Sequence, residues 1–261
     1  MIAAKGGHDR LLAVHAFAVS ESATREGLTR PDAPRSFRHE FVFELPDRLW
    51  RFADNRPQFS GVTAEVVNRA RRVHWTSTGG GPSRSSWSDG EANFMARQVE
   101  ELQAVYFLET RFLQPTVVAV SKEREGLRSV TRVEAKTTWL ARVVYTVDDV
   151  THLPARVVVT PLVRAPNSTA APFPGTPVTY ELAEYIDVDG IKLPARDRSA
   201  YLAFRVNPNI DPQLFETPPD GARTADAWMK WLRNPGGDHN WLNVKGRKYE
   251  IRSRRGYWRG Q

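Results

Sequence analysis

The stretch Asp187-Val188-Asp189-Gly190 has carboxylates at the spacing with which a calcium-binding loop begins. A loop of the EF-hand type needs glycine at its sixth position and a bidentate glutamate at its twelfth. Counted from Asp187, these positions hold Lys192 and Arg198 instead. The pair Asp189-Gly190, set between two alternating runs, is typical of a two-residue hairpin, because glycine tolerates the positive φ of a type I′ turn. We therefore expect a hairpin here and no calcium site.

Other residues that could perform catalysis or bind a metal lack the spacing that such chemistry needs. The six histidines form neither H-x-H-x-D-H nor H-E-x-x-H, the spacings that bring imidazoles together on zinc. The chain lacks cysteine and a G-x-S-x-G motif, and the three glycines at 79–81 lack the lysine of a phosphate loop. Asp148 and Asp149 are adjacent, and because aspartate favours turns we expect them in a loop. We predict no catalytic residue, no metal ligand and no cofactor.

The composition, with 41% hydrophobic and 26% charged residues, is that of an ordinary globular protein. No stretch reaches the roughly 18 apolar residues that span a bilayer, so we predict no transmembrane segment. The net charge of +7 is concentrated in residues 238–261, which contain seven Lys or Arg residues against two acidic ones. Aromatic residues are interleaved with these cations, so single-stranded nucleic acid is one candidate partner of the tail. We favour a solvated extension over nucleic-acid binding.

Alternating hydrophobic residues predict the elements that would position a site. Runs of period two occupy 37–45, 139–147, 178–186 and 200–206, and 155–163 is apolar on both faces. Successive side chains of a strand point to opposite faces, so these runs predict strands of a meandering antiparallel sheet. Two helices are expected, one from a capping box at Ser88 and Glu91 to Pro115, and a short one over 224–233.

The continuity of the strand pattern predicts one domain over residues 1–235, followed by a basic, aromatic-containing tail over 236–261. At the N-terminus, Lys5 and Arg10 precede a mainly apolar run of nine residues at 11–19, which loosely resembles a signal peptide. His15 interrupts this apolar run. We therefore favour a short helix that leads into the first strand.

Five segments, taken in order, resemble outer-membrane lipoprotein-sorting proteins of the LolA/LolB-like superfamily. These segments are KGGHDRLLAVHAF (5–17), ELPDRLWRF (44–52), YTVDDVTHLPARVVV (145–159), YIDVDGIKLPAR (185–196) and VNPNIDPQLFETP (206–218). The resemblance implies a mainly β (α+β) fold, in which helices cover the concave face of a strongly curved antiparallel half-barrel. It also implies a non-enzymatic protein of the periplasm or cell envelope, provided that the natural export signal is missing from this sequence.

In that superfamily the concave face receives a lipid or another apolar ligand, and a lipoprotein or envelope protein is the partner that the resemblance implies. The aromatic residues on the alternating strands that we predict to bind such a ligand are Phe41, Phe43, Trp139 and Tyr145. An ordinary hydrophobic core would use the same residues. Burial of acyl surface would contribute roughly 25 cal/mol per Å² to binding.

A second resemblance leaves another function open. Similar regions precede metallo-β-lactamase-fold domains in some bacterial proteins, and GGDHNWLNVKGRKYEI (236–251) resembles the first strand of such a domain. The zinc motif of that domain does not follow in this sequence. On this interpretation the chain would be an accessory domain of a metallo-hydrolase, without catalytic activity of its own.

Overall fold

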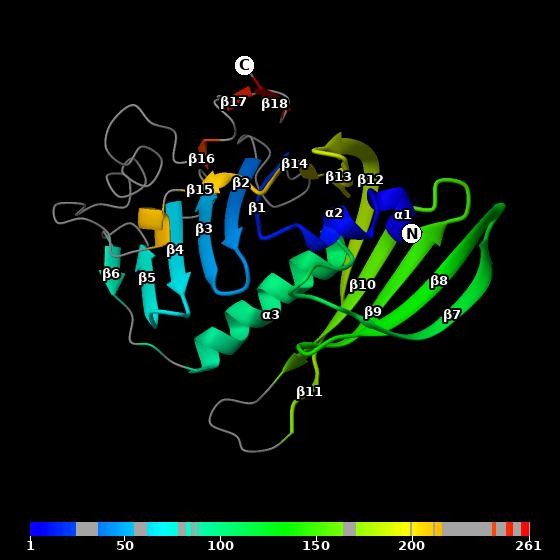
Figure 1. Cartoon of the computed structure of the whole chain (residues 1–261), viewed down its shortest axis with the longest axis horizontal. Helices are drawn as coiled ribbons and strands as arrows, with labels where there is room; N and C mark the ends of the chain where they lie inside the picture. The colour runs from blue at the N-terminus through cyan, green and yellow to red at the C-terminus, as the bar shows by residue number, and fades with distance from the viewer. Residues whose placement is uncertain are drawn as a thin grey trace, which may run out of the picture. The chain divides into compact units, whose positions relative to one another are not determined.

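A computed structural model describes residues 1–24, 36–54, 62–77, 82–84, 87, 89–163, 171–198, 200–210, 212–215, 242–243, 249–252 and 257–260. The chain divides into two compact units. Unit 1 comprises Met1–His15 and Asn93–Arg198, and unit 2 comprises Ala16–Ala92 and Ser199–Gln261. Both units consist mainly of antiparallel strands in open sheets, with few helices among the described residues, which confirms the predicted mainly β (α+β) fold (Figure 1).

The sheet of unit 2 has the strand order β6-β5-β4-β3-β2-β1-β14. Its strands are β1 (Ala16–Thr24), β2 (Ser36–Glu44), β3 (Arg48–Asp54), β4 (Val62–Asn68), β5 (Val73–Ser77), β6 (Pro82–Arg84) and β14 (Ala200–Val206). β2 and β14 confirm the strands predicted at 37–45 and 200–206. Phe17 and Phe43 lie opposite each other in the β1–β2 register, and their buried rings stack with centroids 4.6 Å apart.

Several short elements of unit 2 follow β14. They are β15 (Asn209–Ile210), a 3-10 helix over Pro212–Phe215, β16 (Leu242–Asn243), β17 (Tyr249–Arg252) and β18 (Tyr257–Gly260). β15 pairs with β16, and β17 pairs with β18, so the predicted tail contains a short hairpin. The helix predicted at 224–233 and the domain boundary predicted at residue 235 lie outside the described residues.

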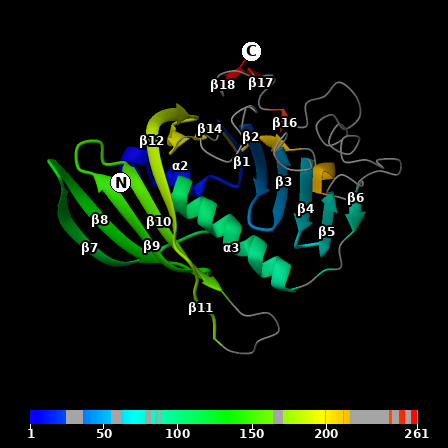
Figure 2. The same cartoon turned by 180° about the vertical axis from the view of Figure 1, so that it is seen from behind.

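The sheet of unit 1 has the strand order β13-β12-β10-β9-β8-β7, and β11 pairs with β10. Its strands are β7 (Thr116–Glu125), β8 (Arg128–Lys136), β9 (Leu140–Asp148), β10 (Pro154–Val163), β11 (Phe173–Pro174), β12 (Val178–Val188) and β13 (Ile191–Asp197). β9, β10 and β12 confirm three predicted strands. Figures 1 and 2 both show a curved sheet with β7 at its outer edge.

Three α-helices occur in the described part of the chain. α1 (Ile2–Lys5) and α2 (His8–Leu12) precede β1, which confirms the short helical start expected at the N-terminus. α3 (Asp89–Tyr106) is the predicted long helix, and most of it belongs to unit 1. It ends before Pro115 because Leu108 already has a positive φ of 71°. Ser88, the predicted cap, lies outside the described residues.

The turn between β12 and β13 is the predicted hairpin. Asp189 and Gly190 both have positive φ values, 53° and 82°, as a type I′ turn requires. The Gly190 amide donates to Asp187 Oδ1 at 2.8 Å, so the first aspartate of the motif supports the turn. After the turn, Ile191 and Leu193 are buried, as the alternation predicts.

Candidate ligand-binding face

Two tyrosine hydroxyl groups attach α3 to one face of the unit 1 sheet. Tyr145 on β9 donates to the Ala104 carbonyl oxygen at 3.2 Å, and Tyr180 on β12 donates to Glu101 Oε1 at 2.6 Å. We call the side of the sheet that carries Tyr145 the helix face, and the other side the opposite face. Because residues directly opposite each other in an antiparallel pair lie on the same face, the strand register extends this assignment across the sheet.

The helix face is apolar from β12 to β7. One row of cross-strand partners runs through Tyr180, Val157, Tyr145, Val133 and Val120. The neighbouring row runs through Val178, Val159, Val143, Ala135 and Val117. The members of both rows on β9 and β10 are buried, as expected for residues on the face to which α3 is attached.

The same two rows become exposed where they reach β7. Every residue of β7 is exposed, and the exposed fractions of Val117 and Val120 are 57% and 63%. Val118, at a β-bulge between Val117 and Ala119, is 58% exposed. A continuous apolar surface thus passes from the packed interior under α3 to a solvent-exposed strip on β7, which we call the valine strip (Val117, Val118 and Val120).

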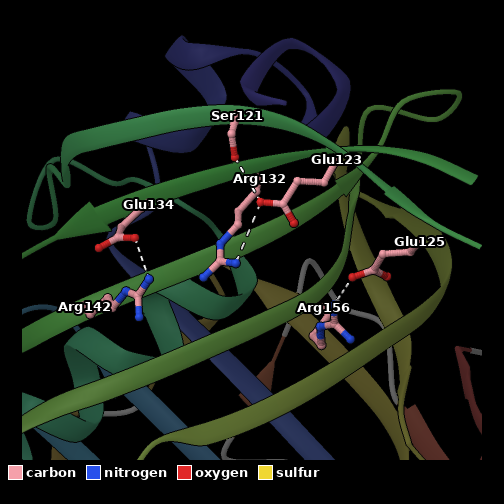
Figure 3. A network of polar contacts seen from close by, with 7 residues as sticks. All are labelled: Ser121, Glu123, Glu125, Arg132, Glu134, Arg142 and Arg156. Atoms are coloured by element: carbon pink, nitrogen blue, oxygen red, sulfur yellow. Dashed lines mark hydrogen bonds and ion pairs between the residues drawn. The ribbon is translucent and has the colours of Figure 1, made fainter.

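The opposite face of the same strands carries charged side chains beside apolar ones such as Val130 and Val144. Figure 3 shows its charged side chains, which form ion pairs between different strands of the sheet. Arg142 Nη2 lies 2.7 Å from Glu134 Oε2, and Arg132 Nη1 lies 3.8 Å from Glu123 Oε1. Arg156 pairs with Glu125. The two faces of this sheet therefore differ in chemistry, although both lie on the same strands.

One carboxylate lies within the packed side of unit 1. Glu100 on α3 accepts hydrogen bonds from the Thr137 hydroxyl and, at 2.7 Å, from the Trp139 amide. Burial raises the pKa of Glu100, and these two hydrogen bonds partly offset that rise. Both donors precede β9, so the contacts hold the start of that strand against the helix.

Lys5 at the end of α1 is fully buried, and its Nζ has no hydrogen-bond partner. The ammonium group lies 5.2 Å from the centroid of the Tyr185 ring. Desolvation lowers the pKa of Lys5 from 10.5 to about 7. The next residue, Gly6, fits tightly, because a Cβ there would lie 2.3 Å from the Gly190 carbonyl oxygen. The N-terminal Lys-Gly-Gly and the Asp-Gly turn are therefore neighbours in unit 1.

The four residues predicted to bind a ligand lie in two pairs. Phe41 and Phe43 lie on β2 of unit 2, with parallel rings whose centroids are 6.2 Å apart. Tyr145 and Trp139 belong to unit 1, Tyr145 on β9 and Trp139 just before it. Phe43 and Tyr145 are buried, whereas Phe41 and Trp139 are half-buried. The role of these four residues in ligand binding stays a prediction.

Sequence reasoning missed the valine strip. Its signal is the β-branched run TVVAV at 116–120, which is typical of strands, followed by the alternating charges SKERE. Of the predicted turn residues, Asp148 and Asp149 do lie where β9 ends. Asp149 accepts hydrogen bonds from the hydroxyls of Ser129 and Thr131, both at 2.6 Å. These bonds, in that order, are the main cause of its lowered pKa.

Within the described residues, no three or more His, Asp or Glu side chains are grouped so that they could hold a metal ion. Three of the histidines instead contact carboxylates: His8 with Glu109, His39 with Glu21 and His74 with Glu65. None of the helices in the described residues has the length and apolar character needed to cross a membrane.

Comparison with solved structures gives two relevant similarities. The first is to a LolA superfamily protein from Nitrosomonas europaea, with a TM-score of 0.42, 12% identity, and coverage of 80% of this chain and 97% of that one. The second is to a putative outer membrane lipoprotein-sorting protein domain from Vibrio parahaemolyticus, with a TM-score of 0.38 and 13% identity. It covers 77% of this chain and 88% of that domain. No protein-family model and no curated protein matches the chain.

The predicted resemblance to the LolA superfamily is therefore found among solved structures as well.

Proposed function

We propose that the chain is a non-enzymatic protein of the cell envelope that binds a lipid or another apolar ligand on the helix face of the unit 1 sheet. The observation that carries this proposal is the valine strip, where the apolar surface under α3 continues into solvent. An exposed apolar surface that continues from a packed interior is typical of a site that another molecule covers. A lipoprotein with its acyl chains is the cargo that a lipoprotein-sorting-like role would supply.

The size of the strip fits a small apolar ligand. Burial of one valine side chain stabilises a complex by about 1.5 kcal/mol or more. Three exposed valines therefore supply several kcal/mol, before the cost of ordering the ligand is subtracted. Micromolar binding of a single chain needs about 8 kcal/mol, so contacts with half-buried residues such as Val133 would have to supply the remainder.

The valine strip also indicates how Tyr145, one of the four predicted residues, would take part. Tyr145 lies in the same row as Val120 and holds α3 through its hydroxyl. A ligand that starts at the valine strip would reach Tyr145 only if α3 moved away from the sheet. We therefore propose that the valine strip is the first contact and that Tyr145 is a deeper one.

A pair of adjacent substitutions tests the proposal. Val120 and Ser121 are neighbours on β7 that point to opposite faces, and both are exposed. Val120→Asp should reduce the affinity for a single-chain lipid at least tenfold, because the carboxylate would have to be desolvated in the complex. Ser121→Asp adds the same charge on the opposite face and should leave the affinity unchanged. Isothermal titration calorimetry measures both, and native mass spectrometry of lipid-exposed protein gives the stoichiometry.

Absence of lipid binding by the unaltered chain would refute the proposal. Equal losses in the two variants would also count against it, because they would show that the helix face is not the binding face. Circular dichroism of both variants checks that the sheet is intact.

A further inference from the structure

The alternating charges of β7 are sorted by the pleat of the strand. In the sequence Ser121-Lys-Glu-Arg-Glu125, residues of opposite sign alternate, and neighbouring side chains point to opposite faces. Lys122 lies opposite Thr131, and Arg124 lies opposite Ser129, in the β7–β8 register. Both cations therefore lie on the helix face, in line with Val120.

The two glutamates of this stretch lie on the opposite face, where arginines neutralise them. Glu123 pairs with Arg132 and accepts a hydrogen bond from the Ser121 hydroxyl at 3.1 Å. Glu125 pairs with Arg156 (Figure 3). Within the described part of the chain, Lys122 and Arg124 form no comparable ion pair.

One acidic group lies near the two cations. Asp149 is held first by the Ser129 and Thr131 hydroxyls, and Lys122 contributes to lowering its pKa from a greater distance. A single, hydrogen-bonded carboxylate leaves the pair Lys122 and Arg124 with excess positive charge. The helix face of β7 thus passes from valine to cation within about 7 Å, the rise of two strand residues.

We propose that the ligand of this face is a monomeric anionic amphiphile, with its acyl chain along the valine strip and its anionic headgroup beside Lys122 and Arg124. This inference rests on the proposed function and specifies the charge of the ligand. Apolar contact supplies the affinity, while the two cations select among headgroups through charge complementarity. The headgroup lies towards the end of the β7–β8 hairpin.

Two lysolipids with the same oleoyl chain test the charge selection. Lysophosphatidylglycerol has an anionic headgroup, and lysophosphatidylcholine has a zwitterionic one. The unaltered chain should bind the anionic lysolipid about tenfold more tightly, as expected for two exposed charge contacts. This ratio should shrink in high salt, which screens exposed charges.

Charge-removing variants locate the selection. The double variant Lys122→Gln, Arg124→Gln should bind the two lysolipids equally and keep the affinity for lysophosphatidylcholine. Lys136→Gln is the matched control, because Lys136 is an exposed cation of the same sheet that shares the opposite face with Glu134. This control should keep the tenfold preference.

The outcomes separate this inference from the function on which it rests. Equal binding of both lysolipids by the unaltered chain, or an unchanged preference in the double variant, overturns the anionic ligand and leaves apolar binding in place. Binding of neither lysolipid overturns both. Binding to phosphatidylglycerol vesicles, without binding of monomeric lysolipid, would assign the cations to a membrane surface and overturn the inference as well.

Discussion

Replacement of Lys5 by methionine should increase the free energy of unfolding at pH 7. Lys5 is fully buried, its Nζ lacks a hydrogen-bond partner, and desolvation lowers its pKa from 10.5 to about 7. Between these two values the unfolded chain holds a proton that the folded chain has released. Folding requires Lys5 to release this proton, and the release costs less free energy at higher pH. The free energy of unfolding therefore increases as the pH rises through this window.

The pKa shift sets the size of the effect. With one pKa unit equal to about 1.4 kcal/mol, Lys5 costs the folded state about 4 kcal/mol at pH 7 and about 1.4 kcal/mol at pH 9.5. The Tyr185 ring offsets part of this cost through a cation–π interaction of about 1 kcal/mol. Methionine has a similar length and no charge. The difference in free energy of unfolding between Lys5→Met and the unaltered protein should thus shrink by about 2–3 kcal/mol from pH 7 to pH 9.5.

Urea denaturation of both proteins at pH 7 and pH 9.5 measures this difference. Comparison of the two proteins cancels every other group that titrates in the window. Hydrogen exchange of the α1 amides is the second measurement, because α1 can separate from the sheet without unfolding of the whole chain. If the difference between the two proteins stays constant with pH, both in the free energy of unfolding and in the exchange of the α1 amides, then Lys5 does not lose its proton on burial and the reasoning is refuted.

Three further substitutions have expected outcomes. Gly6→Ala should expose α1 to proteolysis more than Gly7→Ala does, because both glycines have positive φ but only at Gly6 would a Cβ collide with backbone. Tyr145→Phe should lower the free energy of unfolding by about 1 kcal/mol in chemical denaturation, because it removes the hydrogen bond to α3. Glu100→Gln should stabilise the protein more at pH 7 than at pH 4. The raised pKa of Glu100 means that folding stability falls as the pH rises above 4.5, and glutamine imitates the neutral form.

The sequence predicted those parts of the fold that local patterns determine. The Asp189-Gly190 turn was predictable because a type I′ turn depends on two residues alone. β14 was predictable because burial on one face gives a period of two. β7 escaped prediction because all its residues are exposed, so that no buried face imposes that period.

The candidate site was only partly predictable, because its defining features depend on contacts between distant residues. Phe43 and Tyr145 were singled out as aromatic, and both are buried. Nothing local indicates that Lys5 is buried, since lysine is almost always exposed. The exposure of Val120 likewise depends on which distant residues pack over β7, and the sequence of β7 alone does not determine this.

The pleat of β7 would make the proposed ligand preference sensitive to a change in length as well as to a change in residue type. Deletion of Ser121 would shift Lys122 and Arg124 by one position and transfer their side chains to the face that carries Arg132. Glu123 would move to the helix face at the same time. Deletion of this one residue would thus exchange the two faces of the strand and reverse the sign of the charge beside the valine strip. The net charge of the chain would stay the same. Insertions and deletions in this strand would therefore provide a short evolutionary route from an anion-selective to a cation-selective relative.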